Sequence, residues 1–267
     1  MSRTPRNLLL CSVYLVVVVG ITSVILITPA WVDTSGSTAQ TSSSTSASSG
    51  PRNLAMQPEA VRVARRLGKR FNPSSRTAFV LTGTLTIDAS WQPVNITRSR
   101  SNKGERVDIL VASRALTWHT EEGARAASST LTDMERQLVE RLVYDSSDYF
   151  VLAQLRGASY YTVARNVRPE DAPDNYDGPL WTVVRVEEPP VDEQNTEPVR
   201  RWRLFYINSI TGLIDKIVGE EQGQPIEANF SEWTEQSGEK FPTTITWTSN
   251  GQTLMTLNLT NLSTAAH

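Results

Sequence analysis

The order of hydrophobic and polar positions divides this chain into three parts. An unbroken apolar run without a charged residue, Leu8–Ile27, comes first. Residues 57–71 then carry apolar side chains at helical spacing: Ala60, Val61, Ala64, Leu67 and Phe71. From about residue 78 onward, apolar and polar residues alternate in most segments. This period of two predicts strands with one dry face and one wet face.

The first apolar run is long enough to cross a membrane. At about 1.5 Å per residue, Leu8–Ile27 covers a hydrocarbon core of about 30 Å. The nearest cleavage site, residues 28–30, is a poor match to the small residues that a secretory signal needs. Arg3 and Arg6 precede the run, and positive charge favours the cytoplasmic side. We expect residues 1–32 to be a cytoplasmic tip and a transmembrane anchor (an uncleaved signal), with cleavage as the alternative.

The segment after the anchor, residues 33–54, is rich in serine and threonine. Such a composition cannot bury enough apolar surface to fold, so we expect a flexible linker. The only cysteine, Cys11, lies in the apolar run, so the domain at residues 55–267 has no internal disulfide. We expect a single-pass protein of the bacterial inner membrane with this domain in the periplasm. The full chain has a net charge of -2, which gives no electrostatic case for a nucleic-acid partner.

The folded domain is predicted to be α+β. About ten or eleven strands are expected, in the runs 77–90, 93–100, 105–113, 115–120, 159–167, 180–188, 199–208, 212–221, 225–233, 241–249 and 252–262. Short turns such as Asn250-Gly251 join neighbouring runs and favour antiparallel hairpins. Thr130 or Thr132 could cap a helix in the middle, and a second short helix is expected to end at Gly157. This order favours one antiparallel sheet with helices on one face.

The helix predicted near residue 60 has a basic face, formed by Arg62, Arg65, Arg66, Lys69 and Arg70. Contact with anionic lipid headgroups is one interpretation of this face, because the domain is expected to be tethered to a membrane. An ordinary solvated helix face is the other interpretation, and the sequence favours it.

Candidate chemistry is sparse. His119 has no histidine, cysteine or carboxylate partner signalled nearby, and His267 ends the chain. The acidic loop at residues 171–178 fails the calcium-loop pattern. Glu220 and Glu221 are neighbours on a predicted strand, so they are expected to point to opposite faces. We expect no enzymatic activity, no cofactor and no metal site.

The dry faces of the strands provide the remaining candidate site. Either they form an ordinary sheet–helix core, or an incompletely filled sheet leaves an apolar groove for a ligand. The candidate groove residues are Phe79, Leu81, Leu85, Ile87, Trp118, Trp202, Leu204, Tyr206, Trp247 and Leu257.

The C-terminal third also shows a familiar succession of strands and turns. A strand ending in an aromatic residue leads through a Thr-Gly-Leu turn, at Tyr206–Leu213, and a later Gly-x-Lys-Phe-Pro turn lies at Gly238–Pro242. This pattern resembles the outer-membrane lipoprotein-carrier (LolA/LolB-like) superfamily, as a divergent periplasmic relative. The resemblance implies a strongly curved antiparallel sheet, an incomplete β-barrel covered by helices. It also implies a non-enzymatic protein with an apolar cavity for acyl chains.

Two functions follow as hypotheses. The leading one is a membrane-tethered extracytoplasmic domain that binds a lipid or an acylated protein in an apolar groove, in lipoprotein or outer-membrane lipid handling. The alternative is an envelope regulatory or sensor domain that binds a protein partner, such as another membrane protein.

Overall fold

The structure is a computed structural model that describes residues 58–68, 78–101, 104–120, 123–126, 130–189, 201–221 and 223–265. All of them belong to the second of the two units into which the chain divides, Pro51–His267. The predicted membrane anchor at residues 1–32 and the predicted linker at residues 33–54 lie outside the described residues. Among the helices in the described part of the chain, none has the length and apolar character needed to cross a membrane.

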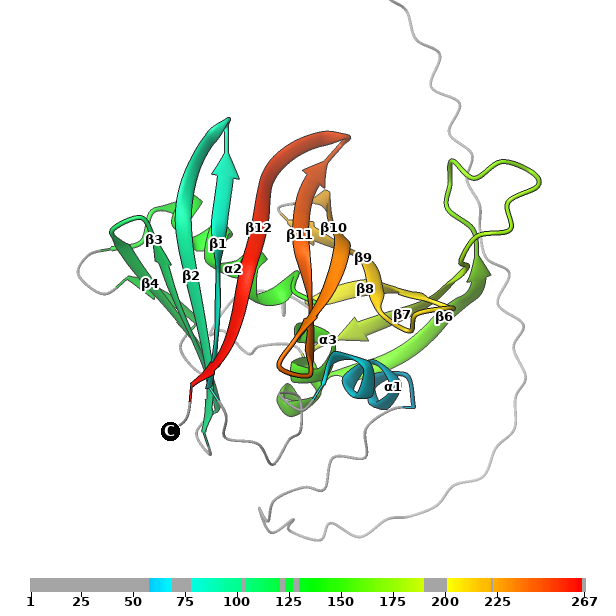
Figure 1. The fold of residues 1–267 in the computed structure, drawn as a ribbon, viewed down its shortest axis with the longest axis horizontal. Coiled ribbons are helices and arrows are strands. Elements are labelled where there is room, and N and C mark those ends of the chain that lie inside the picture. The colour runs from blue at the N-terminus through cyan, green and yellow to red at the C-terminus, as the bar shows by residue number, and fades with distance from the viewer. Residues whose placement is uncertain are drawn as a thin grey trace, which may run out of the picture. The chain divides into compact units, whose positions relative to one another are not determined.

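The described residues contain one antiparallel sheet of 12 strands (Figure 1). The strands are β1 (Ala78–Ile87), β2 (Ser90–Ser101), β3 (Gly104–Val111), β4 (Arg114–His119), β5 (Gly123–Ala126), β6 (Ser159–Val167), β7 (Trp181–Glu187), β8 (Trp202–Asn208), β9 (Ile214–Glu221), β10 (Gln224–Gln236), β11 (Glu239–Ser249) and β12 (Gln252–Ala265). Their order across the sheet is β5-β4-β3-β2-β1-β12-β11-β10-β9-β8-β7-β6. Because β5 and β6 are at the two ends of this order, the sheet is not closed into a barrel. All eleven predicted strand runs are present, and the short strand β5 was not predicted.

Chain connections between neighbouring strands are mostly tight hairpins, as the sequence predicts. Between β11 and β12, Asn250 and Gly251 have φ values of 49° and 76°. Two successive positive φ values match the twist of the flanking strands, and Asn-Gly is the pair that adopts them most readily. Only one neighbouring pair, β1 and β12, joins strands far apart in the sequence, and it brings the C-terminal strand to the middle of the sheet.

The helices are α1 (Pro58–Leu67), α2 (Asp133–Tyr144), α3 (Tyr149–Leu152) and the short 3-10 helix η2 (Ala153–Arg156). Thr132 caps α2: its hydroxyl accepts from the Glu135 amide at 3.2 Å, and the Glu135 carboxylate accepts from the Thr132 amide at 2.8 Å. Gly157 ends η2 in the left-handed conformation, with φ 79°. Both of these helix boundaries agree with the sequence prediction.

All the helices pack on one face of the sheet, which we call the helix-covered face. The sheet bends around α2 and α3, so that β2–β5 lie on one side of the helices and β6–β8 on the other (Figure 1). Trp118 of β4 contacts Tyr144 of α2 edge to face, and Phe205 of β8 contacts Phe150 of α3 in the same way. Helix α1 packs against α3 and β11 through Ala60, Val63 and Leu67. The predicted curved sheet with helices on one face is therefore confirmed.

Candidate functional site

Seven of the ten predicted groove residues lie on the helix-covered face. They are Phe79, Leu81, Leu85, Ile87, Trp118, Trp247 and Leu257. Six of them are buried, and Ile87 is half-buried against the same core. Their side chains pack against the helices and against each other, so they form the interior of the domain. A ligand-binding role for them stays a prediction.

The other three, Trp202, Leu204 and Tyr206, lie on the opposite face of β8. The alternate residues of this strand, such as Arg203 and Phe205, are buried against the helices. The prediction that Trp202, Leu204 and Tyr206 form the buried face of β8 is therefore wrong. Both faces of β8 carry large apolar side chains, and the inward face includes a charged residue. Alternation alone consequently selected the wrong face, and these three residues do not join the other seven.

Little open space remains between the helices and the sheet. An apolar cavity of about 30 Å³ is bordered by the end of α2 and by β1, β2, β11 and β12. Of the predicted groove residues, it contacts Leu81, Trp247 and Leu257. Ligand pockets usually enclose about 300–1,000 Å³, whereas a single water molecule occupies about 30 Å³. In this structure the domain's own side chains fill most of the predicted groove.

A buried polar segment, Asp145–Asp148, joins α2 to α3. Arg203 Nε donates a hydrogen bond to Asp145 Oδ1 at 2.6 Å. From the other half of the sheet, Arg98 Nη2 donates to Ser146 Oγ at 3.1 Å and to the Leu142 carbonyl at 2.8 Å. Because Arg203 is on β8 and Arg98 is on β2, the two arginines connect the helices to both halves of the sheet.

A second ionic group surrounds the buried carboxylate of Glu188. Its Oε2 atom lies 3.3 Å from Arg156 Nη2 and 3.6 Å from Arg201 Nη1. The Arg201 guanidinium is 3.8 Å from the centre of the Tyr144 ring, and Arg156 is 5.3 Å from that of Trp118. Burial raises the pKa of Glu188 by more than the neighbouring arginines lower it. This cluster holds β7 and the start of β8 against α2 and η2.

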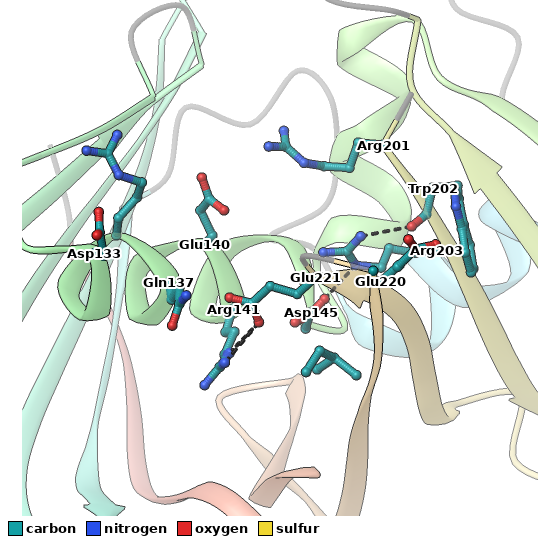
Figure 2. A pocket seen from close by; sticks show the side chains of 13 residues that line it. Asp133, Gln137, Glu140, Arg141, Asp145, Arg201, Trp202, Arg203, Glu220 and Glu221 are labelled. Atoms are coloured by element: carbon teal, nitrogen blue, oxygen red, sulfur yellow. Dashed lines mark hydrogen bonds and ion pairs between the residues drawn. The ribbon is translucent and has the colours of Figure 1, made fainter. Parts of the chain in front are cut away.

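A pocket with a volume of about 460 Å³ lies between α2 and the ends of β8, β9 and β10 (Figure 2). We call it the α2 pocket. Its lining residues are Asp133, Arg136, Gln137, Glu140, Arg141, Asp145, Arg201, Trp202, Arg203, Glu220, Glu221, Gly223 and Ile226. Figure 2 shows side chains reaching it from one side of α2 and from β8 and β9. Its volume is within the range of ligand pockets, but its lining is mostly charged.

Two ion pairs fix part of this lining. The guanidinium of Arg141 donates to Glu221 Oε2 from Nε at 3.0 Å and from Nη2 at 2.9 Å. Arg203 is held by Asp145, as described above. The second oxygen of Glu221, Oε1, is buried and has no hydrogen-bond partner among the described residues. For an incoming ligand, the exposed carboxylate of Glu220 can accept a hydrogen bond, and Arg201 or Arg136 can donate one at the border of the pocket.

Sequence reasoning did not find the α2 pocket. Asp133, Arg136, Gln137 and Glu140 recur at helical spacing and could have marked a polar face of α2. No local signal connects that face with β9, which is about 80 residues later. The expectation that Glu220 and Glu221 point apart is also incomplete, because both border the pocket where β9 ends.

His119 is the last residue of β4 and is half-exposed. No group of three or more histidine, cysteine, aspartate or glutamate side chains is arranged to hold a metal ion within the described ranges.

The sequence matches no model of a known protein family and no curated protein. Among solved structures, the chain is similar to a DUF1329 family protein from Desulfovibrio piger, at 10% identity and a TM-score of 0.44, over 76% of this chain and 89% of that one. It is also similar to the LolA superfamily protein NE2245 from Nitrosomonas europaea, at 10% identity and a TM-score of 0.42, over 76% and 92%. The Pseudomonas aeruginosa MucA/MucB complex matches at 15% identity and a TM-score of 0.24, over 78% and 57%. A LolA superfamily protein, the group that the C-terminal third of the sequence resembles, is thus among these neighbours.

Proposed function

We propose that residues 55–267 form a binding domain, held on the periplasmic side of a bacterial inner membrane, whose α2 pocket takes a charged segment of a protein partner. The observation that carries this proposal is the α2 pocket itself, about 460 Å³ in volume and bordered by arginines and carboxylates. The proposed role is binding and not catalysis.

The charges of the α2 pocket favour a peptide over an acyl chain. A hydrocarbon chain placed there would remove Arg201, Glu220 and Glu140 from water without giving them hydrogen bonds, which is costly. A peptide carries backbone N–H and C=O groups and charged side chains that can pair with both signs. The pocket follows α2 from Asp133 to Asp145, which is about 18 Å at 1.5 Å per residue. That length matches about five residues of extended chain.

The structure also offers specific points of contact for such a segment. A lysine or arginine of the partner can pair with the carboxylate of Glu220, which is exposed at the pocket. Carbonyl or carboxylate oxygens of the partner can accept from Arg201 and Arg136, and the indole of Trp202 offers an apolar contact. We therefore expect a partner segment with at least one basic residue and with an apolar residue near it.

Lipid binding is the second candidate, and the apolar cavity of about 30 Å³ favours it. An acyl chain would need α2 and α3 to move away from Leu81, Trp247 and Leu257. That movement would break the Arg203–Asp145 pair and the contacts of Arg98 with α2. Because several buried charged hydrogen bonds oppose this opening, the α2 pocket is the stronger site in this structure.

Site-specific photocrosslinking of the full chain in cells tests the proposal. A photoreactive residue replaces Arg136, which is exposed at the α2 pocket, and the matched control replaces Asn95, exposed on the opposite face of the sheet. We expect an adduct with one protein at position 136, lost on Glu220→Lys, and no such adduct at position 95. Peptide mapping of the adduct should place a basic residue beside the crosslink.

Two outcomes would overturn the proposal. One is the same set of adducts at positions 136 and 95. The other is an adduct that survives Glu220→Lys combined with Arg201→Glu in a chain that is still folded by circular dichroism. Lipid binding is separated by native mass spectrometry of the chain purified from membranes. A retained acyl ligand that is displaced by Leu81→Trp would support the second candidate instead.

A further inference from the structure

A basic surface of α1 lies beside an exposed apolar residue. Arg62, Arg65 and Arg66 of α1 are exposed, while the opposite side of the helix is buried against α3 and β11. Ile210, in the turn between β8 and β9, is 70% exposed. We call these four residues the basic docking surface.

Arg66 connects the two parts of this surface. Its side chain lies against the β8–β9 turn, where a β-carbon added to Gly212 would be 3.4 Å from Arg66 Cγ. The turn itself is held in place by Asn208, whose Oδ1 atom accepts from the Ile210 amide and from the Thr211 amide, each at 3.0 Å. Ile210 is thus presented on a fixed turn next to the arginines of α1.

Carboxylates near the basic docking surface are already engaged. Glu59 of α1 pairs with Arg165 of β6 at 3.2 Å. Near the β8–β9 turn, Asp215 accepts hydrogen bonds from Trp181 Nε1 at 2.9 Å and from Asn208 Nδ2 at 2.8 Å. Glu59 is thus neutralised by Arg165, and Asp215 is directed to Trp181 and Asn208, so neither carboxylate forms an ion pair with any of the three arginines of this surface in the described residues.

The position of α1 in the chain, close after the predicted membrane span, indicates that this surface can contact the membrane. The predicted membrane span ends at Ile27 and α1 begins at Pro58, so about 30 residues separate them. A serine-rich chain of that length has a root-mean-square reach of about 30 Å. The membrane surface is therefore within reach of the first helix of the domain, at a high effective concentration.

We propose that the basic docking surface binds the periplasmic face of the inner membrane. The arginines contact anionic phospholipid headgroups, and Ile210 enters the interfacial region. Positive charge attracts the anionic bilayer, and one apolar side chain beside that charge adds contact with the lipid. The inference rests on the predicted N-terminal anchor and is independent of the α2 pocket, which would stay open to a partner.

Fluorescence quenching in nanodiscs tests this inference with the full chain. Cys11→Ser removes the only cysteine, and Ile210→Cys then accepts an environment-sensitive dye. The matched control is Trp91→Cys, because Trp91 is 71% exposed and lies at the start of β2, in the β1–β2 hairpin whose turn is at the far end of these strands from α1 (Figure 1). Brominated phosphatidylcholine is the quencher, with or without phosphatidylglycerol.

We expect quenching at position 210 with phosphatidylglycerol, much weaker quenching without it, and none at position 91. Each arginine contributes roughly fivefold to the docking equilibrium, so Arg62→Gln with Arg65→Gln should lower it roughly 25-fold. Both substitutions are at exposed positions, and circular dichroism checks that the domain stays folded.

Equal quenching at positions 210 and 91, or quenching that ignores both phosphatidylglycerol and the two arginines, would overturn the inference. Quenching that appears only after a second protein is added would assign the surface to a protein partner. If cells remove the N-terminal segment, the mature chain is mixed with vesicles of the same lipids. A lack of quenching at position 210 there also counts against membrane docking.

Discussion

Arg203 of β8 donates a hydrogen bond of 2.6 Å to Asp145, the residue that follows α2, and both side chains are largely buried. The neighbouring strand makes room for it at Gly219, where a β-carbon would lie 2.6 Å from Arg203 Cδ. If either partner were removed, the other charge would stay buried without a counter-charge, which is energetically costly. This pair therefore ties the helix layer to β8 and forms one wall of the α2 pocket.

Removing one partner of this pair should strongly destabilise the domain. Asp145→Ala leaves the Arg203 guanidinium buried without its carboxylate, which we expect to lower the free energy of unfolding by about 3–5 kcal/mol. Urea unfolding followed by tryptophan fluorescence measures the loss. Arg106→Ala, which breaks the exposed Arg106–Asp108 pair, is the control, with an expected loss below about 1 kcal/mol. Similar losses in the two variants would contradict the role given to the buried pair.

The two faces of β8 should respond differently to truncation. Phe205 is 0% exposed and its ring centre is 4.9 Å from that of Phe150, so Phe205→Ala should cost about 3–5 kcal/mol. Leu204 is half-buried on the other face, and Leu204→Ala should cost clearly less. The same unfolding measurement ranks them. A larger loss for Leu204→Ala would restore the face predicted from the sequence.

The buried carboxyl of Glu105 should give the domain a measurable pH dependence. Burial raises its pKa by more than Arg98 and Arg100 lower it, so the folded state favours the protonated form. The stability from this group is fully present below its ordinary pKa of about 4.5 and is lost as the pH rises through the raised value.

Glu105→Gln cannot titrate and isolates this effect. The free energy of unfolding of the variant minus that of the native chain should increase as the pH rises from acid to neutral. Unfolding of both chains at a series of pH values gives this difference, in which all other titrating groups cancel. A difference that falls with pH would mean that the ion pair with Arg98 outweighs burial.

The N-terminal cap of α2 should contribute less to the free energy of unfolding than the buried Arg203–Asp145 pair. Thr132→Ala removes the hydroxyl that accepts from the Glu135 amide, and we expect a loss of about 1 kcal/mol. Thr132→Ser keeps the hydroxyl and should keep most of the stability. Thermal unfolding by circular dichroism compares the three chains. Equal losses in the alanine and serine variants would show that packing of the threonine methyl, and not the hydrogen bond, matters here.

Much of the fold could be predicted from local pattern. The alternation in Leu81, Leu85 and Leu257 placed these side chains on the correct face, because each strand there has only one apolar face. Helix α2 was predicted with Thr130 or Thr132 as its cap, and the structure shows Thr132 in that role, paired with Glu135. β5 was missed, since four residues are too few to show a period.

The candidate site was not predictable in the same way. The predicted groove assumed a partly empty interior, but the fit of α2 and α3 against the sheet leaves about 30 Å³ there. The α2 pocket depends on Arg141 and Glu221, which are 80 residues apart in the sequence. Neither residue has a local pattern that marks the other as its partner.

The sequence by itself determined the order of elements, the hairpin turns and the helix caps. It also determined the buried face of those strands that carry apolar residues on one face only. These features depend on interactions within a few residues, where spacing and side-chain type decide the energy. The tertiary structure alone decided that β8 turns Arg203 inward and Trp202 outward, and that the polar face of α2 meets the end of β9. The curvature of the whole sheet decides which side chains of β8 and β9 meet α2. This curvature depends on the twist of all the strands together and on the helices packed against them, so no local pattern encodes it.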